Sequence, residues 1–330
     1  MSSPRVLTIV LNWRTPEMTL KAVAAARCAM EGIAGEITVV DNDSQDGSFE
    51  HLSEQVRAEG WANVRVIQSG RNGGFGAGNN VGIRAGLADG TAPDYVYILN
   101  SDAFPAPDAI QRLLDYLEST PNAGFAGSLI QGPEGDTHLT TFRFPSIASE
   151  FEGAVRLGPI SRLLKNARVP VETPTSAGRV DWLAGASLMM RQSVLDQIGL
   201  FDETFFLYFE ETDLCRRALK AGHEVHFVPE SRVAHIGSAS TGMKEWRRVP
   251  GYWFDSRAYY FRKNHGAAYA AIATVAHVFG GVLHRVRARL SGKSPADPPR
   301  FLRDLIRHAT GRPKADRTPA PAPRLNGANG

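Results

Sequence analysis

Cysteine is scarce in this chain: Cys28 and Cys215 are the only two in 330 residues. They are far apart in sequence and both lie in segments with helical patterning. Two such residues make neither the disulfide framework of a small secreted protein nor a cysteine zinc cluster. We expect buried free thiols in a protein of a reducing compartment.

Long apolar runs are missing as well. The first one, Val6 to Leu11, suffices for a strand but not for a secretory leader, so synthesis in the cytoplasm is expected. The longest uncharged run, residues 267–283, is just short of the roughly 20 residues that a membrane-spanning helix needs, and alanine and valine dominate it. We expect it to form a helix that packs on the protein or lies in a membrane interface, with a membrane-spanning helix as the alternative.

Neither positive nor negative charge is in large excess over the whole chain, whose net charge is +3, but the charges are unevenly distributed. From Lys244 onward there are 17 Lys and Arg against 5 Asp and Glu, whereas the first 243 residues have 20 against 29. A basic C-terminal quarter predicts an anionic neighbour. Because no nucleic-acid-binding module is recognisable, an anionic membrane surface is the expected partner, and nucleic acid is not.

The rest of the composition is that of a globular protein, with 43% apolar and 22% charged residues. The first 130 residues alternate strand and helix patterns, which indicates an α/β fold with a mostly parallel sheet flanked by helices. The expected strands are 6–11, 37–40, 64–67, 95–99 and 125–130, and the expected helices are 48–59, 76–88 and 108–118, besides one that begins at residue 15.

That first helix has a strong start signal, Thr15-Pro16-Glu17, which supplies an N-cap residue, a proline for the first turn and an early acid. The residues that follow at helical spacing, and so are expected to share one face, are Leu20, Val23, Ala24, Arg27 and Cys28.

Ligands of parallel α/β sheets bind beyond the carboxyl ends of the strands. In this chain that rule selects four segments: Asn12-Trp13, Asp41-Asn42, Asn72 to Asn80, and Asn100-Ser101-Asp102. The Asp41 carboxylate can accept hydrogen bonds from a base or a ribose, although capping of its own turn is the alternative.

The segment Asn72 to Gly78 is a loop whose glycines let the backbone approach a ligand closely. It is not a dinucleotide-binding fingerprint. Asn79 stands where the third glycine belongs, and the loop follows the third strand instead of the first. This argues against a nicotinamide-dependent oxidoreductase.

Two acidic segments indicate chemistry at a metal and at a base. Asp102 follows a hydrophobic strand, where an acid can coordinate Mg²⁺ or Mn²⁺ that in turn binds a diphosphate; His235 follows later in the chain. Glu210, Glu211 and Asp213 stand beside a run of aromatic residues, which raises the cost of ionising both members of a carboxylate pair and favours a base suited to neutral pH. Solvated acids at the start of a helix are the alternative.

These motifs together resemble those of family 2 glycosyltransferases with a GT-A fold, close to the rhamnosyltransferase-like branch. The resemblance covers roughly residues 5–265. It is carried by Val10-Leu-Asn-Trp13, Val39-Val-Asp-Asn-Asp-Ser44, Asn72-x-Gly-Phe-Gly-x-Gly-Asn79, Leu99-Asn-Ser-Asp102, Trp182-Leu-x-Gly-Ala186, Phe201-Asp-Glu203, Glu210-Glu-x-Asp-Leu214 and His235-x-Gly-Ser238.

The resemblance implies a donor site. Asp41 corresponds to the acid that contacts the nucleotide's pyrimidine, and Asn12 and Trp13 to the base pocket beside it. Asp102 and His235 correspond to ligands of a metal on the donor diphosphate, with Asn100 in place of a partner acid. The other residues expected to bind the nucleotide sugar are Asn42, Asn72, Gly73, Gly74, Phe75, Asn79 and Ser101.

The resemblance also implies an inverting transfer. Glu211 occupies the position of the catalytic base, where aspartate is more usual, so Glu210 or Asp213 could compete for the role. Trp182 and Gly185 are expected on the acceptor side, although Trp182 could equally be a core aromatic residue.

The expected organisation has three parts. Residues 1–240 form a GT-A catalytic domain, in which 1–130 bind the nucleotide sugar and 131–240 carry the acceptor side and the base; a mobile acceptor-side segment is expected within 131–180. Residues 241–290 form a basic helical extension that could associate with a membrane. Residues 291–330 form a tail rich in Pro, Arg and Ala, largely disordered.

The expected function is metal-dependent, inverting transfer of a sugar, with dTDP-L-rhamnose as the donor. The acceptor is a hydroxyl of a cell-envelope glycan or of a polyprenyl-diphosphate-linked sugar, at the inner face of the cell membrane. The alternatives are a UDP- or GDP-sugar as donor, or a nucleotide-binding scaffold at the membrane that has lost catalysis.

Overall fold

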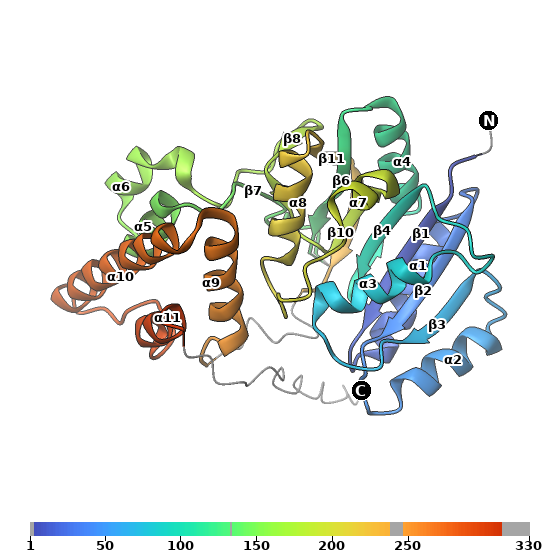
Figure 1. Cartoon of the computed structure of the whole chain (residues 1–330), viewed down its shortest axis with the longest axis horizontal. Helices are drawn as coiled ribbons and strands as arrows, with labels where there is room; N and C mark the ends of the chain where they lie inside the picture. The colour runs from blue at the N-terminus through green and yellow to red at the C-terminus, as the bar shows by residue number, and fades with distance from the viewer. Residues whose placement is uncertain (1–2, 133, 238–246, 312–330) are drawn as a thin grey trace.

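A nine-stranded sheet forms the centre of the protein in the computed structural model, which describes residues 3–132, 134–237 and 247–311 (Figure 1). Its strand order is β3-β2-β1-β4-β10-β6-β11-β5, with β8 added to β11. The strands of this sheet are β1 Val6–Asn12, β2 Gly35–Asp41, β3 Val64–Gln68, β4 Tyr95–Asn100, β5 Ala103–Pro105, β6 Ala123–Gln131, β8 Gly178–Val180, β10 Ser187–Arg191 and β11 Glu224–His235. A separate two-stranded sheet pairs β7 Thr141–Phe142 with β9 Trp182–Leu183.

The large sheet is mostly parallel, as expected. Strands β1 to β4 pair in parallel, β6 pairs in parallel with β11, and β10 lies antiparallel between β4 and β6. The short strands β5 and β8 also run antiparallel to β11. The parallel strands β1, β2 and β4 are buried on both faces, which explains their continuous hydrophobic sequences.

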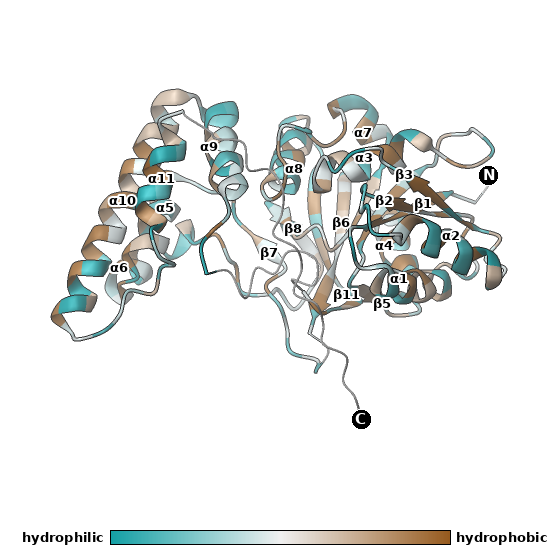
Figure 2. Ribbon diagram, turned by 90° about the horizontal axis from the view of Figure 1, so that it is seen from below, coloured by the Kyte–Doolittle hydropathy of each residue, from teal (hydrophilic) through white to brown (hydrophobic). Residues whose placement is uncertain are grey.

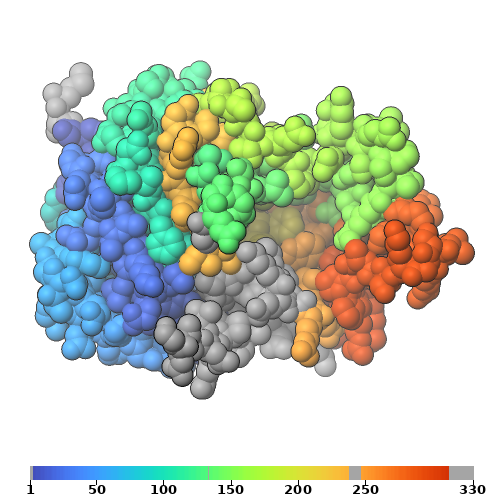
Figure 3. Space-filling view, turned by 180° about the vertical axis from the view of Figure 1, so that it is seen from behind, coloured from blue at the N-terminus to red at the C-terminus, as the bar shows by residue number. Residues whose placement is uncertain are grey.

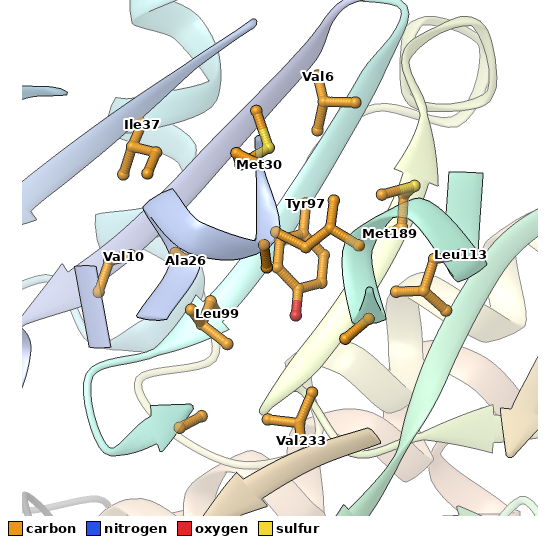
Figure 4. Close-up of a cluster of buried hydrophobic side chains, with 14 of the residues drawn as sticks. Val6, Val10, Ala26, Met30, Ile37, Tyr97, Leu99, Leu113, Met189 and Val233 are labelled. Atoms are coloured by element: carbon orange, nitrogen blue, oxygen red, sulfur yellow. The ribbon is translucent and has the colours of Figure 1, made fainter. Parts of the chain in front are cut away.

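Helices cover both faces of the sheet. Those of the described residues are α1 Pro16–Ala29, α2 Ser48–Ala58, α3 Phe75–Ala85, α4 Ala109–Ser119, α5 Ile147–Val155, α6 Gly158–Leu163, α7 Gln192–Ile198, α8 Glu210–Lys220, α9 Gly251–His265, α10 Ala267–Leu290 and α11 Phe301–Ala309, with a 3-10 turn at Lys165–Ala167. Helices α1, α2 and α4 enclose one core, in which Met30 and Leu113 pack against Tyr97 of β4 (Figure 4). Helices α3, α7 and α8 enclose the other.

The first helix begins where the sequence predicts, but a different face is buried. Pro16 is its first residue, and the Thr15 side chain makes no capping hydrogen bond. Small residues let the helix lie close to the sheet, so the buried positions are Thr19, Ala22, Val23, Ala26 and Ala29. As a result Cys28 is exposed, which corrects the expectation of two buried thiols; Cys215, on α8, is buried.

The C-terminal helices pack beside the sheet as a lobe together with α5 and α6, which come from the middle of the chain (Figures 1 and 3). A buried ion pair joins three of these helices: Arg257 of α9 donates to Glu150 of α5 at 2.7 Å, and His277 of α10 lies 2.6 Å from the same carboxylate. Gly280 of α10 is so close to α5 that a Cβ would meet the Phe151 carbonyl oxygen at 2.9 Å.

The segment after residue 290 is more ordered than expected. Residues 301–309 form α11, whose Leu302 and Leu305 pack against Phe254 of α9. Two apolar residues at this spacing bury one face of even a short helix. The rest of the expected tail, 312–330, lies outside the described residues, as do Ser238 of the His235 motif and residues 239–246.

Helix α10 has a continuous apolar face turned to solvent. Mean hydropathy and length alone would allow this helix to cross a membrane, and 22% of its most apolar window is buried in the protein. The large exposed side chains recur every three or four residues along it: Ile272, Val275, Phe279, Val282, Leu283, Val286 and Leu290. Figure 2 shows hydrophobic stretches along the length of this helix.

Candidate functional site

A cavity of about 430 Å³ opens at the carboxyl ends of β1, β2 and β4. This is the position at which parallel α/β sheets bind ligands, and the volume is that of a small-molecule site. The predicted site residues that line it are Trp13, Asn42, Asn72, Gly74, Phe75, Asn100, Ser101, Asp102, Trp182, Gly185, Glu210, Glu211 and His235.

Asn12 and Asp41 are not among the residues that line the cavity but are completely buried next to it. The Asn12 side-chain amide donates to Asp41 Oδ1 at 2.7 Å, and the Ser44 hydroxyl donates to the same atom at 2.6 Å. The Ser44 backbone N–H also donates to Asp41 Oδ2. In this conformation Asp41 caps its own turn, the structural alternative considered from the sequence, and thereby positions Asn42 at the cavity wall.

The glycine loop, residues 72–78, leads into the first turn of α3 and closes one side of the cavity. Its backbone lies against the segment that precedes α8. Gly74 has a φ of +91°, and a Cβ there would lie 1.7 Å from the carbonyl oxygen of Phe206. The Phe75 N–H donates to that oxygen at 3.0 Å. Glycine is therefore required at this position both by conformation and by space. Gly73 and Asn79 lie outside the lining, and Asn79 instead donates to the Phe75 carbonyl.

Asp102 and His235 lie together at the cavity wall. The antiparallel pairing of β5 with β11 places His235 opposite Ala103, and its Nε2 lies 3.0 Å from Asp102 Oδ1 and 3.4 Å from the Asn100 amide. A carboxylate oxygen and an imidazole nitrogen this close together fit two positions of a divalent cation's shell. Within residues 3–132, 134–237 and 247–311, no group of three or more His, Cys, Asp or Glu converges on one point, so a cation here would need further oxygens from its ligand.

Two more carboxylates line the cavity at the start of α8, where Glu210 is buried and Glu211 half-buried. Burial raises the pKa of Glu211 to about 7. Burial, and next the neighbouring Glu211 charge, raise the pKa of Glu210 well above its ordinary value. The Oε2 atom of each has no hydrogen-bond partner among the described residues. An acid with a pKa near neutrality and an unbonded oxygen at a cavity can accept a proton.

Asp213, the third acid of the motif, lies against α9. Its side chain is fully buried and accepts hydrogen bonds from Arg217, Lys263 and Asn264 at 2.9, 2.7 and 3.1 Å. It lines no part of the cavity. The structure thus separates Asp213 from the two candidate bases.

The part of the cavity where the acceptor is expected is aromatic. The Trp182 ring stacks on Phe142 of β7 with centroids 4.2 Å apart, and its indole N–H donates to the Arg143 carbonyl oxygen at 2.9 Å. These contacts fix the ring while leaving it at the cavity wall. A fixed aromatic surface of this kind can contact the apolar face of a sugar.

Sequence reasoning missed several lining residues: His138, Phe142, Phe206, Leu207 and Tyr208. His138 lies between β6 and β7 with its ring centroid 6.4 Å from that of His235. Phe206 to Tyr208 belong to the aromatic run beside the acids, so their sequence position was itself a signal. His138 follows a segment rich in Gly with no pattern to suggest a site.

Comparison with known proteins identifies the family of this chain. A family profile described as "Glycosyltransferase like family 2" matches residues 4–249. The chain is 34% identical over 250 residues to the N-acetylglucosaminyl-diphospho-decaprenol L-rhamnosyltransferase of Mycobacterium tuberculosis. The alignment covers 72% of this chain and 78% of that protein. The chain is 30% identical over 165 residues to the rhamnosyltransferase WbbL of Escherichia coli K12, which covers 49% and 60%.

Among solved structures, the mannosyltransferase PcManGT from Pyrobaculum calidifontis in complex with GDP-Man and Mn²⁺ superposes with a TM-score of 0.53. The alignment covers 94% of this chain and 87% of that one at 13% identity. At so low an identity the likeness concerns the fold, which is the GT-A fold in both.

Proposed function

Because the chain belongs to glycosyltransferase family 2 and is therefore a glycosyltransferase, we propose that it transfers L-rhamnose from dTDP-L-rhamnose with inversion. The acceptor is a hydroxyl group of a cell-envelope glycan or of a sugar linked to a polyprenyl diphosphate. The rhamnosyltransferases of Mycobacterium tuberculosis and Escherichia coli among its relatives support the choice of sugar, and the name of the first supports a lipid-linked acceptor.

The observation that carries this proposal is that two groups of different chemistry line one cavity. The Asp102–His235 pair suits a diphosphate and a cation, and Glu210 and Glu211 each have an unbonded carboxylate oxygen. In the proposed binding mode the donor's leaving group lies beside Asp102 and His235, and its anomeric carbon lies within reach of Glu211.

The chemistry we propose is a single displacement. The acceptor oxygen attacks the anomeric carbon, the bond from that carbon to the diphosphate oxygen breaks, and the hydroxyl proton passes to Glu211. The nucleoside diphosphate leaves from the opposite face, so the configuration inverts. Glu210, more deeply buried and with its pKa raised further, stays protonated beside the ionised base.

The cation is proposed to be Mg²⁺ or Mn²⁺, with Asp102 and His235 as its protein ligands. PcManGT, which shares the fold, was solved with Mn²⁺. When bound, the cation would neutralise charge on the departing diphosphate. The side chains of Asn100 and Ser101 lie at the same wall and can donate hydrogen bonds to donor oxygens.

We place the enzyme on the inner face of the cell membrane as a peripheral protein. The apolar face of α10 and the basic residues of the C-terminal quarter support this location, because apolar side chains flanked by arginine bind anionic lipid surfaces. A lipid-linked acceptor would be found there.

The test is release of the nucleotide from a panel of dTDP-, UDP- and GDP-sugars, with an acceptor and with either cation or a chelator. Turnover that is highest with dTDP-L-rhamnose and lost with the chelator is the expected result. Turnover with a UDP- or GDP-sugar alone would contradict the donor. Tight binding of a nucleotide sugar without turnover on any acceptor would instead indicate a scaffold without catalysis.

A further inference from the structure

Helix α9 lies outside the residues matched by the family profile, which end at 249, yet it contacts the segment that carries the candidate base. That segment, Phe206 to Phe209, leads directly into Glu210 and Glu211, and its first three residues line the cavity. A helix beyond the residues that the profile matches thus contacts the segment that carries the candidate base.

The segment before α8 has a strained backbone. Tyr208 and Phe209 have φ values of 70° and 71°, the left-handed region that bulky residues rarely occupy. Two such residues in succession persist only where surrounding contacts impose the conformation. The glycine loop supplies one set of contacts, through the Phe206 carbonyl oxygen.

Helix α9 supplies the other set. The Ser256 hydroxyl donates to the Leu207 carbonyl oxygen at 3.0 Å. The Phe209 ring packs against Tyr260 at 5.5 Å, and the Phe206 ring against Tyr252 at 5.4 Å. These contacts come from one face of α9 and reach both ends of the segment.

Lys263 of α9 fixes the first turn of α8 itself. Its ammonium lies 2.7 Å from Asp213 Oδ2 and 2.7 Å from Asp202 Oδ2, while the Asn264 amide donates to Asp213 Oδ1. Burial opposes ionisation of Asp202, but hydrogen bonds from Lys263, Thr204 and Tyr259 outweigh it and lower its pKa. Both acids accept from one lysine, so α9 is linked to residues on either side of the strained segment.

We propose that α9 is a positioning element for the base and that Lys263 is its principal positioning residue, acting through Asp213 on the start of α8. The inference rests on the proposed function, in which Glu211 receives the proton. The acid that sequence reasoning took for a competing base thereby gains a different role: Asp213 anchors the turn on which the base stands.

Loss of this anchor should lower the rate of the chemical step more than it weakens donor binding. The donor-side residues Asn42, Asn72 and Asp102 lie on the sheet and on the glycine loop, which Lys263 does not touch. Loss of the anchor would let the start of α8 relax and would move the Glu211 carboxylate. A displacement of about 1 Å at a reacting group can lower the rate roughly 100-fold.

The experiment measures kcat and the donor KM of the full-length chain for Lys263→Met, Lys263→Arg and the matched control Arg262→Met. Arg262 is the neighbouring residue on α9 and donates to the Ala309 carbonyl oxygen of α11, away from the site. We expect Lys263→Met to lower kcat roughly 10- to 100-fold with the donor KM within about twofold. Lys263→Arg should restore most of the rate, because a guanidinium can serve two carboxylates, and Arg262→Met should change little.

Two further variants keep the test decisive. If Lys263→Met does not fold, Ser256→Ala removes only the bond to Leu207 and should still lower kcat severalfold with the KM unchanged. A rate for Lys263→Met within twofold of the native rate overturns the inference, as does an equal loss in Arg262→Met. Glu211→Gln, measured in parallel, tests the proposed base separately from the proposed role of Lys263. If this variant retains turnover, Glu211 is not the base, and the proposed role of Lys263 is wrong as well.

Discussion

At the scale of single residues, Glu211 combines two properties that a structural acid does not need. It is buried enough for its pKa to rise to about 7, and one of its oxygens has no partner among the described residues. Glu211→Gln preserves its shape but removes the proton acceptor, so turnover should fall roughly 10²–10⁴-fold while donor affinity survives. Single-turnover kinetics and titration with donor measure the two quantities.

Glu210→Gln is the control, since it changes the neighbouring carboxylate to the same amide. We expect a much smaller loss, because Glu210 is held protonated by burial and by the Glu211 charge. A larger loss in Glu210→Gln than in Glu211→Gln would show that the base is one residue earlier.

The raised pKa of Glu211 also predicts how stability depends on pH. Because the folded-state pKa of about 7 lies above the ordinary 4.5, the folded state binds the proton more tightly than the unfolded state. The stability that depends on protonated Glu211 is therefore fully present below about pH 4.5 and is lost as the pH rises through 7. Glu211→Gln should raise the free energy of unfolding above pH 7 by up to about 3 kcal/mol and have little effect near pH 4.5. Thermal unfolding at both pH values tests this; equal effects at the two would contradict it.

Asp102 gives a prediction on the donor side. Asp102→Asn removes the charge while preserving the size of the side chain beside His235. Cation-dependent binding of nucleotide sugar should be lost, whereas the thermal midpoint without ligand should change little. Calorimetric titration with and without Mn²⁺ measures it. Unchanged affinity in the presence of the cation would remove Asp102 from the metal site.

At the scale of elements, the sequence predicted the parallel strands and their polar ends, because buried strands are continuous hydrophobic runs and their ends carry Asn and Asp. It did not predict which face of α1 is buried. That helix is rich in alanine, so hydrophobicity hardly differs around it, and contact with the sheet decides which face is buried.

The role of Asp213 was hidden for a related reason. Its partners Lys263 and Asn264 are about fifty residues away, and nothing in the local pattern of α8 distinguishes an acid that faces a cavity from one that faces another helix. The sequence named the acids that could be the base, whereas tertiary packing shows that Glu211 lines the cavity and Asp213 contacts α9. Likewise, the α11 segment is short, and its contacts come from residues about fifty positions earlier: Leu302 and Leu305 pack against Phe254, and Asp304 pairs with Arg248.

Helix α10 yields the prediction that belongs to this scale. Val275 and Phe279 are 66% and 57% exposed, so replacing both with Asp should leave the fold intact. If this face lies in a lipid interface, binding to anionic vesicles should weaken at least tenfold, since each side chain contributes about 1.5–3 kcal/mol on burial. Flotation with vesicles measures it. Leu139→Asp, at a similarly exposed position outside the lobe, is the control.

The outcome also distinguishes a second copy of the chain from a membrane. A native protein that is dimeric in solution, and becomes monomeric in the double variant without any loss of vesicle binding, would assign the α10 face to dimerisation. Truncation after residue 265 is a poorer test, because it would also remove His277 from the buried Glu150 carboxylate.

At the scale of the whole molecule, charge is divided between its two ends. Residues 251–311, which form α9 to α11 of the lobe, have 10 Lys and Arg against 3 Asp and Glu, whereas acids outnumber bases in the first 243 residues. Such a molecule should approach an anionic surface lobe first. About 0.5 M salt should release much of the bound protein, since screening then acts over only a few ångströms. Retention in salt, with release by detergent alone, would mean that α10 is deeply inserted.

The two thiols make the molecule convenient for site-specific labelling. Burial raises the pKa of Cys215 to about 12, which leaves it unreactive, while Cys28 is exposed on α1. A maleimide dye should therefore attach at one position without any engineered cysteine. Helix α1 lies on the sheet, at the other end of the molecule from α10 (Figure 1). If the lobe binds a membrane as proposed, a fluorophore on Cys28 would remain in water, and energy transfer to labelled lipids would report the height of the sheet above the bilayer.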